Sequence, residues 1–218
     1  MIAELVEYSY YNKLSLVLLM PLIIVFLMCM VDLLRTKLLF KSLFSNQYFY
    51  KYPHDSVNTL SLYQVLVFLY MSVVLALFLM FLLCDKTYIY QQFFEAFRSA
   101  FYISSSFFIV KYLVSEFLYQ FSNKKLHFKQ MLILETSYLT VVLLVVFLLL
   151  SCVFLHLDYY DSLRNILLII ALLTYFIRFI VLVLNNKNLL SGKVLHIILY
   201  LCTLEIVPFV YLFKSYIE

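Results

Sequence analysis

An unbroken stretch of uncharged sequence constrains this fold more than any other feature of the chain. From Leu60 to Cys84 there are 25 residues without a single Asp, Glu, Lys or Arg. A helix needs about 20 mainly apolar residues to cross the hydrocarbon core of a bilayer. The stretch exceeds that length, so it predicts a membrane-spanning helix with room to tilt.

The composition extends this prediction to the whole chain. Of the 218 residues, 66% are apolar and 13% are charged, and the mean hydropathy is +1.00. Soluble domains carry about 25% charged residues, so lipid must solvate much of this apolar surplus. We therefore predict an all-α polytopic membrane protein with about six transmembrane helices in one bundle, forming a single integral membrane domain over residues 1–218.

The hydropathy pattern places the six expected spans. They cover about residues 14–31, 60–84, 93–120, 136–156, 163–184 and 194–213. The third span differs from the others, because its uncharged core, Ser99–Val110, reaches spanning length only when Lys111 and Glu116 are included. The sequence therefore leaves open whether this helix crosses the bilayer completely.

The basic residues predict the orientation of the chain. Connections after the first, third and fifth spans hold nine Lys or Arg residues: Arg35, Lys37, Lys41, Lys51, Lys124, Lys125, Lys129, Lys187 and Lys193. The opposite side holds five, namely Lys13, Lys86, Arg98, Arg164 and Lys214. Cytoplasmic connections carry the excess of Lys and Arg, so both termini are expected outside. Because these cations are scattered between apolar runs, they indicate topology and not binding to nucleic acid.

The connection after the first span contains an amphipathic pattern over residues 35–55. One helical face carries Leu39, Phe40, Leu43 and Phe44, and the other carries Lys37, Lys41 and Ser45. This spacing favours a helix lying in the membrane interface, held by apolar burial and by attraction to anionic lipid. The alternative is that the first helix continues into the cytoplasm and packs on the bundle.

Several ionisable residues are embedded in apolar sequence and form the candidate site. A charge near the middle of a bilayer costs about 2.5–3.5 kcal/mol on insertion scales, so it usually has a partner and often a role. Glu205 is the strongest example, because it lies near the middle of the sixth span. The candidate buried polar cluster comprises Lys111, Glu116, Arg178, His196, Tyr200, Thr203 and Glu205.

This buried polar cluster has two principal interpretations. An Arg178–Glu205 or Lys111–Glu205 ion pair would fix the helix register without any chemistry. The same residues could instead form a ligand or proton site, or the long side chains could extend to the interface. On the third helix, Ser104, Lys111 and Ser115 share one face, and Ser105, Tyr112 and Glu116 share the next.

The chain lacks the motifs of common enzyme chemistry, with no G-x-S-x-G, H-E-x-x-H or glycine-rich phosphate loop. Its cysteines lie in or at the ends of apolar runs without CxxC spacing, as expected for packing residues. With Gly192 as the only glycine, G-x-x-x-G helix contacts are excluded. We therefore expect no catalytic residues, no metal and no cofactor, and an enzyme is less favoured than a non-enzyme.

The C-terminal part of the chain carries a family resemblance. It reads His196-Ile-Ile-Leu-Tyr-Leu-Cys-Thr-Leu-Glu205-Ile-Val-Pro208, preceded by Tyr175-Phe-Ile-Arg178 and an Asn-Lys-Asn connection. This stretch resembles the signature of small inner-membrane proteins of Bacteroidota, the family called domain of unknown function 4271. The resemblance implies a Gram-negative inner membrane with a periplasmic outside. It makes Arg178, His196 and Glu205 signature positions and supplies no activity, substrate or cofactor.

These observations favour an inner-membrane accessory or scaffold protein that acts through protein partners in the cell envelope. A small permease or substrate-binding membrane subunit is the alternative, because a compact bundle with charges near the midplane suits transport as well. A membrane-embedded enzyme is the third hypothesis. The lipid bilayer is a partner in each case, and no hypothesis involves nucleic acid.

Overall fold

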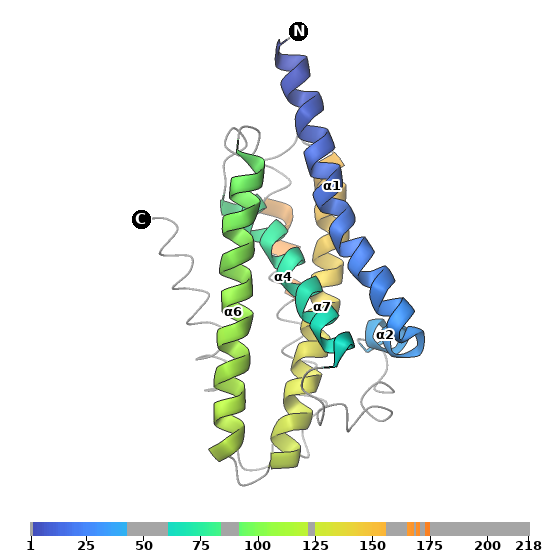
Figure 1. The fold of residues 1–218 in the computed structure, drawn as a ribbon, viewed down its shortest axis with the longest axis vertical. Helices are drawn as coiled ribbons and strands as arrows, with labels where there is room; N and C mark the ends of the chain where they lie inside the picture. Colours follow the sequence, from blue (N-terminus) through green and yellow to red (C-terminus); the bar gives the residue numbers. More distant parts are fainter. Residues whose placement is uncertain are drawn as a thin grey trace.

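The computed structural model describes residues 2–42, 61–83, 92–121, 125–155, 165–167, 169–170 and 173–174. The described residues that are not helical are Asp32, Lys41, Ser42, Ser61 and Gln92, and no described residue lies in a strand (Figure 1). The all-α prediction is therefore confirmed over these ranges.

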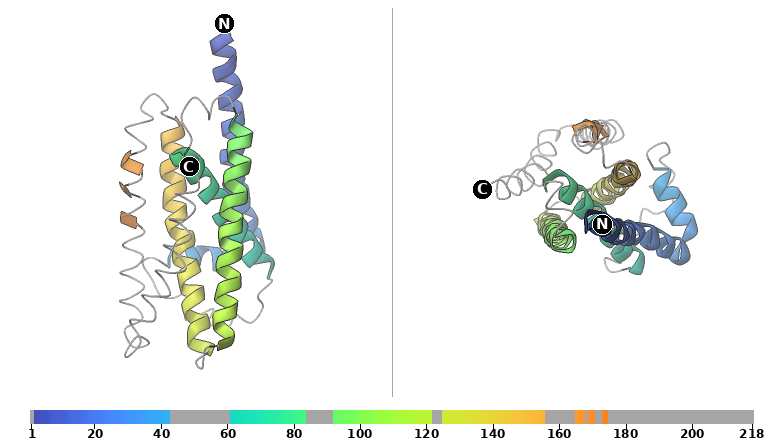
Figure 2. Two further views of the ribbon diagram at one scale, coloured as in Figure 1. Left: turned by 90° about the vertical axis from the view of Figure 1, so that its left-hand side faces the viewer. Right: turned by 90° about the horizontal axis from the view of Figure 1, so that it is seen from above.

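The N-terminal helix ends in a break at Asp32. α1 covers Ile2–Val31 and α2 covers Leu33–Phe40. Between them, Asp32 has an extended backbone with φ −156° and ψ 94°, and its side chain accepts a hydrogen bond from Arg35 N at 2.9 Å. The carboxylate thereby satisfies a backbone N–H that has no partner within the helix, as an N-cap does. The chain turns here, and α2 runs across the long axis of the bundle (Figure 2).

The three long helices that follow are arranged around α4. They are α4 (Leu62–Leu83), α6 (Phe93–Phe121) and α7 (Lys125–Leu155). α4 contacts α1, α6 and α7, and Figure 1 shows it slanting between α1 and α6. Every residue from Tyr70 to Phe81 is buried. A helix that is apolar all round is a buried helix, so α4 is the central helix of the described part.

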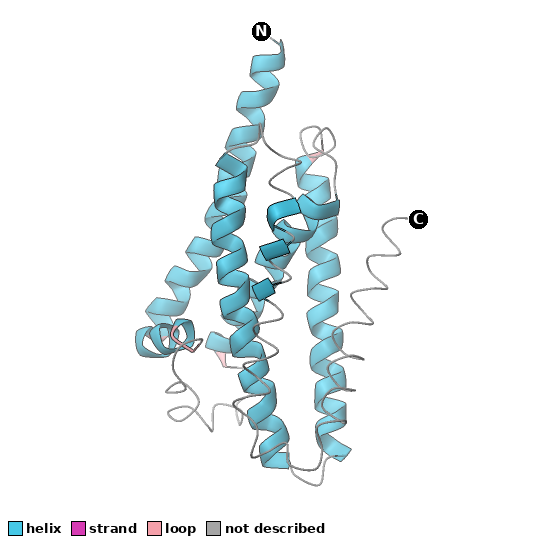
Figure 3. Ribbon diagram, turned by 180° about the vertical axis from the view of Figure 1, so that it is seen from behind, coloured by secondary structure: helices cyan, strands magenta, loops and turns pink. Residues whose placement is uncertain are grey.

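The first four expected segments are helical over their described residues. Two helices, α1 and α7, begin before the apolar sequence of the expected span does. α7 starts at Lys125, well before Thr136, and runs beside α6 when the bundle is seen from behind (Figure 3). Lys, Leu, Gln, Met and Glu all have good helix propensity, so the helix continues through polar sequence. The described residues of the fifth segment are helical, and the sixth segment lies outside the described residues.

Two helices of the described part are long and apolar enough to cross a membrane, against six in the prediction. They are Leu14–Val31 and Leu62–Leu82, each with a mean hydropathy of 2.9. Thr136–Cys152 is a shorter apolar helix. The helical class is therefore established for the described residues, and the six-span architecture stays a prediction.

α2 corrects the expected amphipathic segment. Leu39, assigned from its spacing to a lipid face, is 2% exposed and belongs to the hydrophobic core. Arg35 is also buried, whereas Lys37 and Lys41 are exposed as expected. The Asp32 cap separates this helix from α1, so α2 is not a continuation of the first helix, although it does pack on the bundle. Residues 43–55 of the expected segment lie outside the described residues.

Candidate functional site

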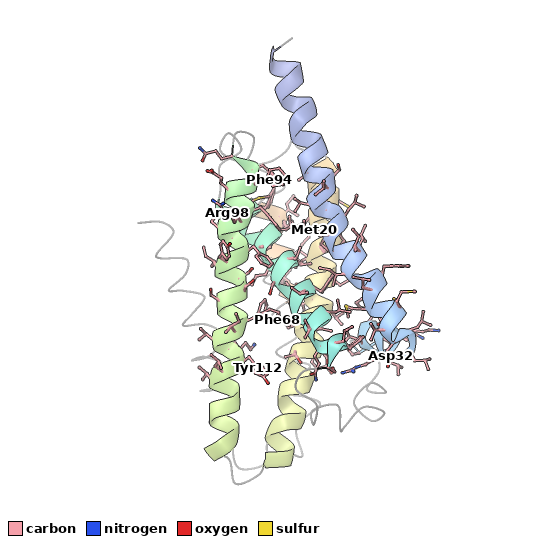
Figure 4. All side chains as sticks on the ribbon, viewed as in Figure 1. Met20, Asp32, Phe68, Phe94, Arg98 and Tyr112 are labelled. Atoms are coloured by element: carbon pink, nitrogen blue, oxygen red, sulfur yellow. The ribbon has the colours of Figure 1, made fainter. Side chains whose placement is uncertain are left out.

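α4 and α6 meet in an antiparallel contact that can be defined residue by residue. Ser104 Oγ donates a hydrogen bond to Ser72 O at 2.9 Å. Phe68, which Figure 4 labels on α4, and Phe108 on α6 meet edge to face with their ring centroids 6.2 Å apart. Residue numbers rise along one helix as they fall along the other, so the two helices run in opposite directions.

The same register brings small residues together. One turn from the Ser104–Ser72 contact, Ala100 on α6 lies level with Ala76 on α4, and both are buried. Ala96, another turn away, is also buried. Small side chains allow helix backbones to approach closely and gain van der Waals contact. Ala96, Ala100 and Ser104, spaced by four residues, therefore take the place of the G-x-x-x-G motif that the sequence lacks. This small-residue pattern was visible in the sequence.

Lys111 continues this contact toward the start of α4. It lies about one turn beyond Phe108, on the same face of α6 as Ser104, and is 7% exposed. The antiparallel register places it level with the first turns of α4. A buried ammonium costs several kcal/mol unless it is paired. Lys111 is therefore the member of the predicted cluster that the structure describes as a buried cation, beside the start of α4.

A second buried cation lies at the same end of α4. Arg35 of α2 is 9% exposed, and its guanidinium carbon lies 4.1 Å from the ring centroid of Tyr63 on α4. A cation over an aromatic face is worth about 2 kcal/mol when desolvated. From the sequence, Arg35 is a topology signal only. Asp32 marks the start of a new helix, but no signal in the sequence pairs Arg35 with Tyr63.

The two cations approach the first turns of α4 from different sides. Tyr63 faces α2, whereas Phe68 and Ser72 face α6, the helix that carries Lys111. The N-terminal end of a helix already carries partial positive charge. The arrangement therefore places two buried cations on different sides of the first turns of α4.

Buried hydroxyl groups extend this polar region into the middle of α4. Tyr70 is 1% exposed, and its Oη has no hydrogen-bond partner within the described part of the chain. Ser72 Oγ also has no hydrogen-bond partner within the described part, although the Ser72 carbonyl oxygen accepts the hydrogen bond from Ser104 Oγ. A buried hydroxyl without a partner costs about 1–3 kcal/mol. Both hydroxyls therefore retain their capacity to donate and to accept a hydrogen bond.

The side chains of the other predicted site residues are not among those that the structure describes. Glu116 belongs to α6, but its side chain is not among those described. Outside the described residues lie Arg178, His196, Tyr200, Thr203 and Glu205. The described ranges contain no group of three His, Cys, Asp or Glu residues that could hold a metal ion.

The described helices define an all-α protein with two cations buried at one end of its central helix. Residues 14–215 match the model of the family described as Domain of unknown function (DUF4271), so the chain belongs to this family. This confirms the family suggested by the C-terminal resemblance. No curated protein and no solved structure matches the chain.

Proposed function

We propose that this is a multi-pass protein of a Gram-negative inner membrane, as its resemblance to Bacteroidota proteins implies, and that it acts as an accessory or scaffold component. The exposed apolar surface of α1 carries this proposal. Its window Leu14–Val31 is 22% buried, and the exposed side chains include Leu16, Leu19, Leu22, Ile23, Phe26 and Leu27. Extended apolar patches on a protein surface mark contact with partners or with lipid, so lipid or a partner helix is expected to cover this surface.

The distribution of polar residues also supports a membrane environment. Arg35 and Lys111 are buried, while Leu33 and Leu34 are 63% and 57% exposed. In water, Lys and Arg are almost never fully buried, and leucine is among the residues most often buried. In lipid, polar side chains turn toward helix interfaces and apolar ones face outward. Arg35, Lys111, Leu33 and Leu34 follow the second pattern, which supports the proposed membrane environment.

The use of the polar side chains favours a scaffold over a transporter. Ser104 hydrogen-bonds to α4, and Arg35 is stacked on Tyr63. Both interactions hold helices together and leave the apolar outer surface of α1 as the surface on which a partner could dock. A protein built in this way is suited to positioning another membrane protein.

Photo-crosslinking in cells tests the scaffold proposal. A photoreactive amino acid replaces Ile23 or Phe26 on the exposed surface of α1, and the matched control replaces Met28, which is buried. The scaffold role predicts the same protein adduct at both exposed positions and none at Met28. Adducts with lipid alone would contradict the scaffold role, and adducts with neither lipid nor protein would contradict the membrane location.

The small permease is the alternative function, and the buried Tyr70 hydroxyl is the observation that favours it. A transport role predicts that Tyr70→Phe, which removes only the hydroxyl, lowers substrate uptake in cells while the folded protein remains as stable as before. A scaffold role predicts that Tyr70→Phe leaves the crosslinked partner adduct unchanged, because that hydroxyl makes no hydrogen bond within the described part.

A further inference from the structure

The outer face of α2 combines two leucines with two lysines. Leu33 and Leu34, in its first turn, are strongly exposed. Lys37 and the C-cap residue Lys41 are exposed one and two turns later. At 3.6 residues per turn these four side chains share one face, and Arg35 lies on the opposite face, against the bundle.

This outer face continues the apolar surface of α1 past the break at Asp32. Met30 and Val31, the last residues of α1, are 72% and 47% exposed. Leu33 and Leu34 follow directly. Because α2 runs across the bundle axis (Figure 2), the apolar surface of α1 turns and ends at this helix. A change from leucine to lysine along an interfacial helix matches the boundary between acyl chains and headgroups.

We propose that the outer face of α2 binds anionic phospholipid headgroups, with Leu33 and Leu34 among the acyl chains and Lys37 and Lys41 on the phosphates. This inference rests on the membrane location proposed above and names the lipid chemistry that the protein recognises. Both exposed charges of the face are positive, and the neighbouring Asp32 is engaged by Arg35 N. An anionic headgroup layer is the surface that complements this arrangement.

The bundle presents this face without help from lipid. Arg35 stacks on Tyr63 of α4, and Leu39 is part of the hydrophobic core. These two contacts fix the rotation of α2 about its own axis. The two lysines are therefore held in place before any headgroup binds, which favours selective binding of lipid over a merely transient encounter.

Native mass spectrometry of the full chain from bilayer nanodiscs tests the proposal. The nanodiscs contain equal amounts of phosphatidylcholine and phosphatidylglycerol, and the ratio of the two bound lipids is measured. Lys37→Gln with Lys41→Gln should lower the preference for phosphatidylglycerol, by up to roughly fivefold for each lysine. The matched control, Lys37→Arg with Lys41→Arg, keeps both charges and should keep the preference. An unchanged ratio in the glutamine variant would overturn the proposal.

A depth measurement separates failure of this inference from failure of the membrane proposal. Single cysteines at Leu34 and at Ile23, in a chain whose native cysteines are serines, carry a fluorophore that lipid-attached quenchers reach from known depths. Quenching at both positions, shallower at Leu34, is expected. Quenching at Ile23 alone would overturn the role of α2 and keep the membrane location. Quenching at neither would overturn both.

Discussion

Ser104 on α6 donates its hydroxyl proton to the backbone carbonyl of Ser72 on α4 at 2.9 Å, and both residues are fully buried. The same hydroxyl lies 3.0 Å from Phe101 O of its own helix, so one proton is shared between a local and an interhelical acceptor. A side chain no larger than serine allows this, because the carbonyl of the neighbouring helix must come within hydrogen-bond distance. The contact therefore depends on the size of residue 104 as well as on its polarity.

This dependence predicts two different effects of mutation. Ser104→Ala should cost about 0.6 kcal/mol, the average for a hydrogen bond between membrane helices. Ser104→Leu should cost about 1–3 kcal/mol, because added volume in a close-packed contact forces helices apart. Denaturation in detergent measures both. Ser106→Ala is the control, since Ser106 is exposed and donates to Tyr102 O of its own helix. A fully stable leucine variant would show that the two helices are not closely packed here.

The stacked pair of Arg35 and Tyr63 predicts a measurable coupling. Arg35→Leu and Tyr63→Leu should each lower the stability of the folded protein, and the double variant should lose less than the sum of the two. The difference is expected near 2 kcal/mol, the value for a desolvated cation–π contact. Tyr102→Leu is the control, because Tyr102 is 64% exposed. Strictly additive losses would mean that the two side chains do not interact.

The cap at Asp32 predicts a local change in backbone protection. Asp32→Ala removes the acceptor of Arg35 N and should cost about 1 kcal/mol, whereas Asp32→Asn keeps an acceptor and should cost little. Hydrogen exchange at the amides of Arg35 and Thr36 is the measurement, and it should accelerate in the alanine variant. Glu95→Ala, in the first turn of α6, serves as the control. Unchanged exchange in Asp32→Ala would show that α2 is held by its packing alone.

The existence of α4 was predictable from sequence because it follows from one property, whereas its central position among α1, α6 and α7 was not part of the prediction. A run without charges from Leu60 to Cys84 can only be buried in protein or lipid, and α4 is both long and enclosed by neighbours. The face shared by Ser104 and Lys111 was also predictable, since helical spacing alone determines it. Both side chains are buried.

The environment of α2 was not predictable, because it depends on a partner distant in sequence. Amphipathic spacing assigns Leu39 to lipid, and Arg35 enters the prediction only as a cytoplasmic charge. The structure instead places Leu39 in the hydrophobic core, and Tyr63 supplies an aromatic face that stabilises the guanidinium of Arg35 inside the bundle. Contacts between segments decide which face of such a helix is buried, and a pattern within one segment carries no information about them.

The orientation of the chain is a prediction that reporter fusions can test. The excess of Lys and Arg on one side motivates a cytoplasmic connection after α2 and external termini. Alkaline phosphatase fused after Glu218 should be active, and a fluorescent protein fused there should be dark. A fusion truncated after Ser45 should give the reverse result and is the internal control. An inactive phosphatase after Glu218 would contradict the six-span topology or its orientation.

The predicted pair of Arg178 and Glu205 has the sharpest test. Leaving one charge of a buried pair alone costs about 3–5 kcal/mol, whereas replacing both charges by apolar groups is often neutral. Glu205→Leu and Arg178→Leu should therefore each lower the yield of folded protein in detergent, and the double variant should recover much of it. Additive losses would show that the two residues are not partners.

Lys111 is the competing partner in the prediction, and its side chain is 7% exposed. If Lys111 neutralises Glu205, the recovery should instead appear in the variant that combines Lys111→Leu with Glu205→Leu. Failure of both double variants to recover would remove Glu205 from the pairing altogether. If a double variant recovers stability, its binding to the partner captured by photo-crosslinking distinguishes a structural pair from a functional one. Partner binding that returns with stability makes the pair structural, and partner binding that stays lost makes it a functional site.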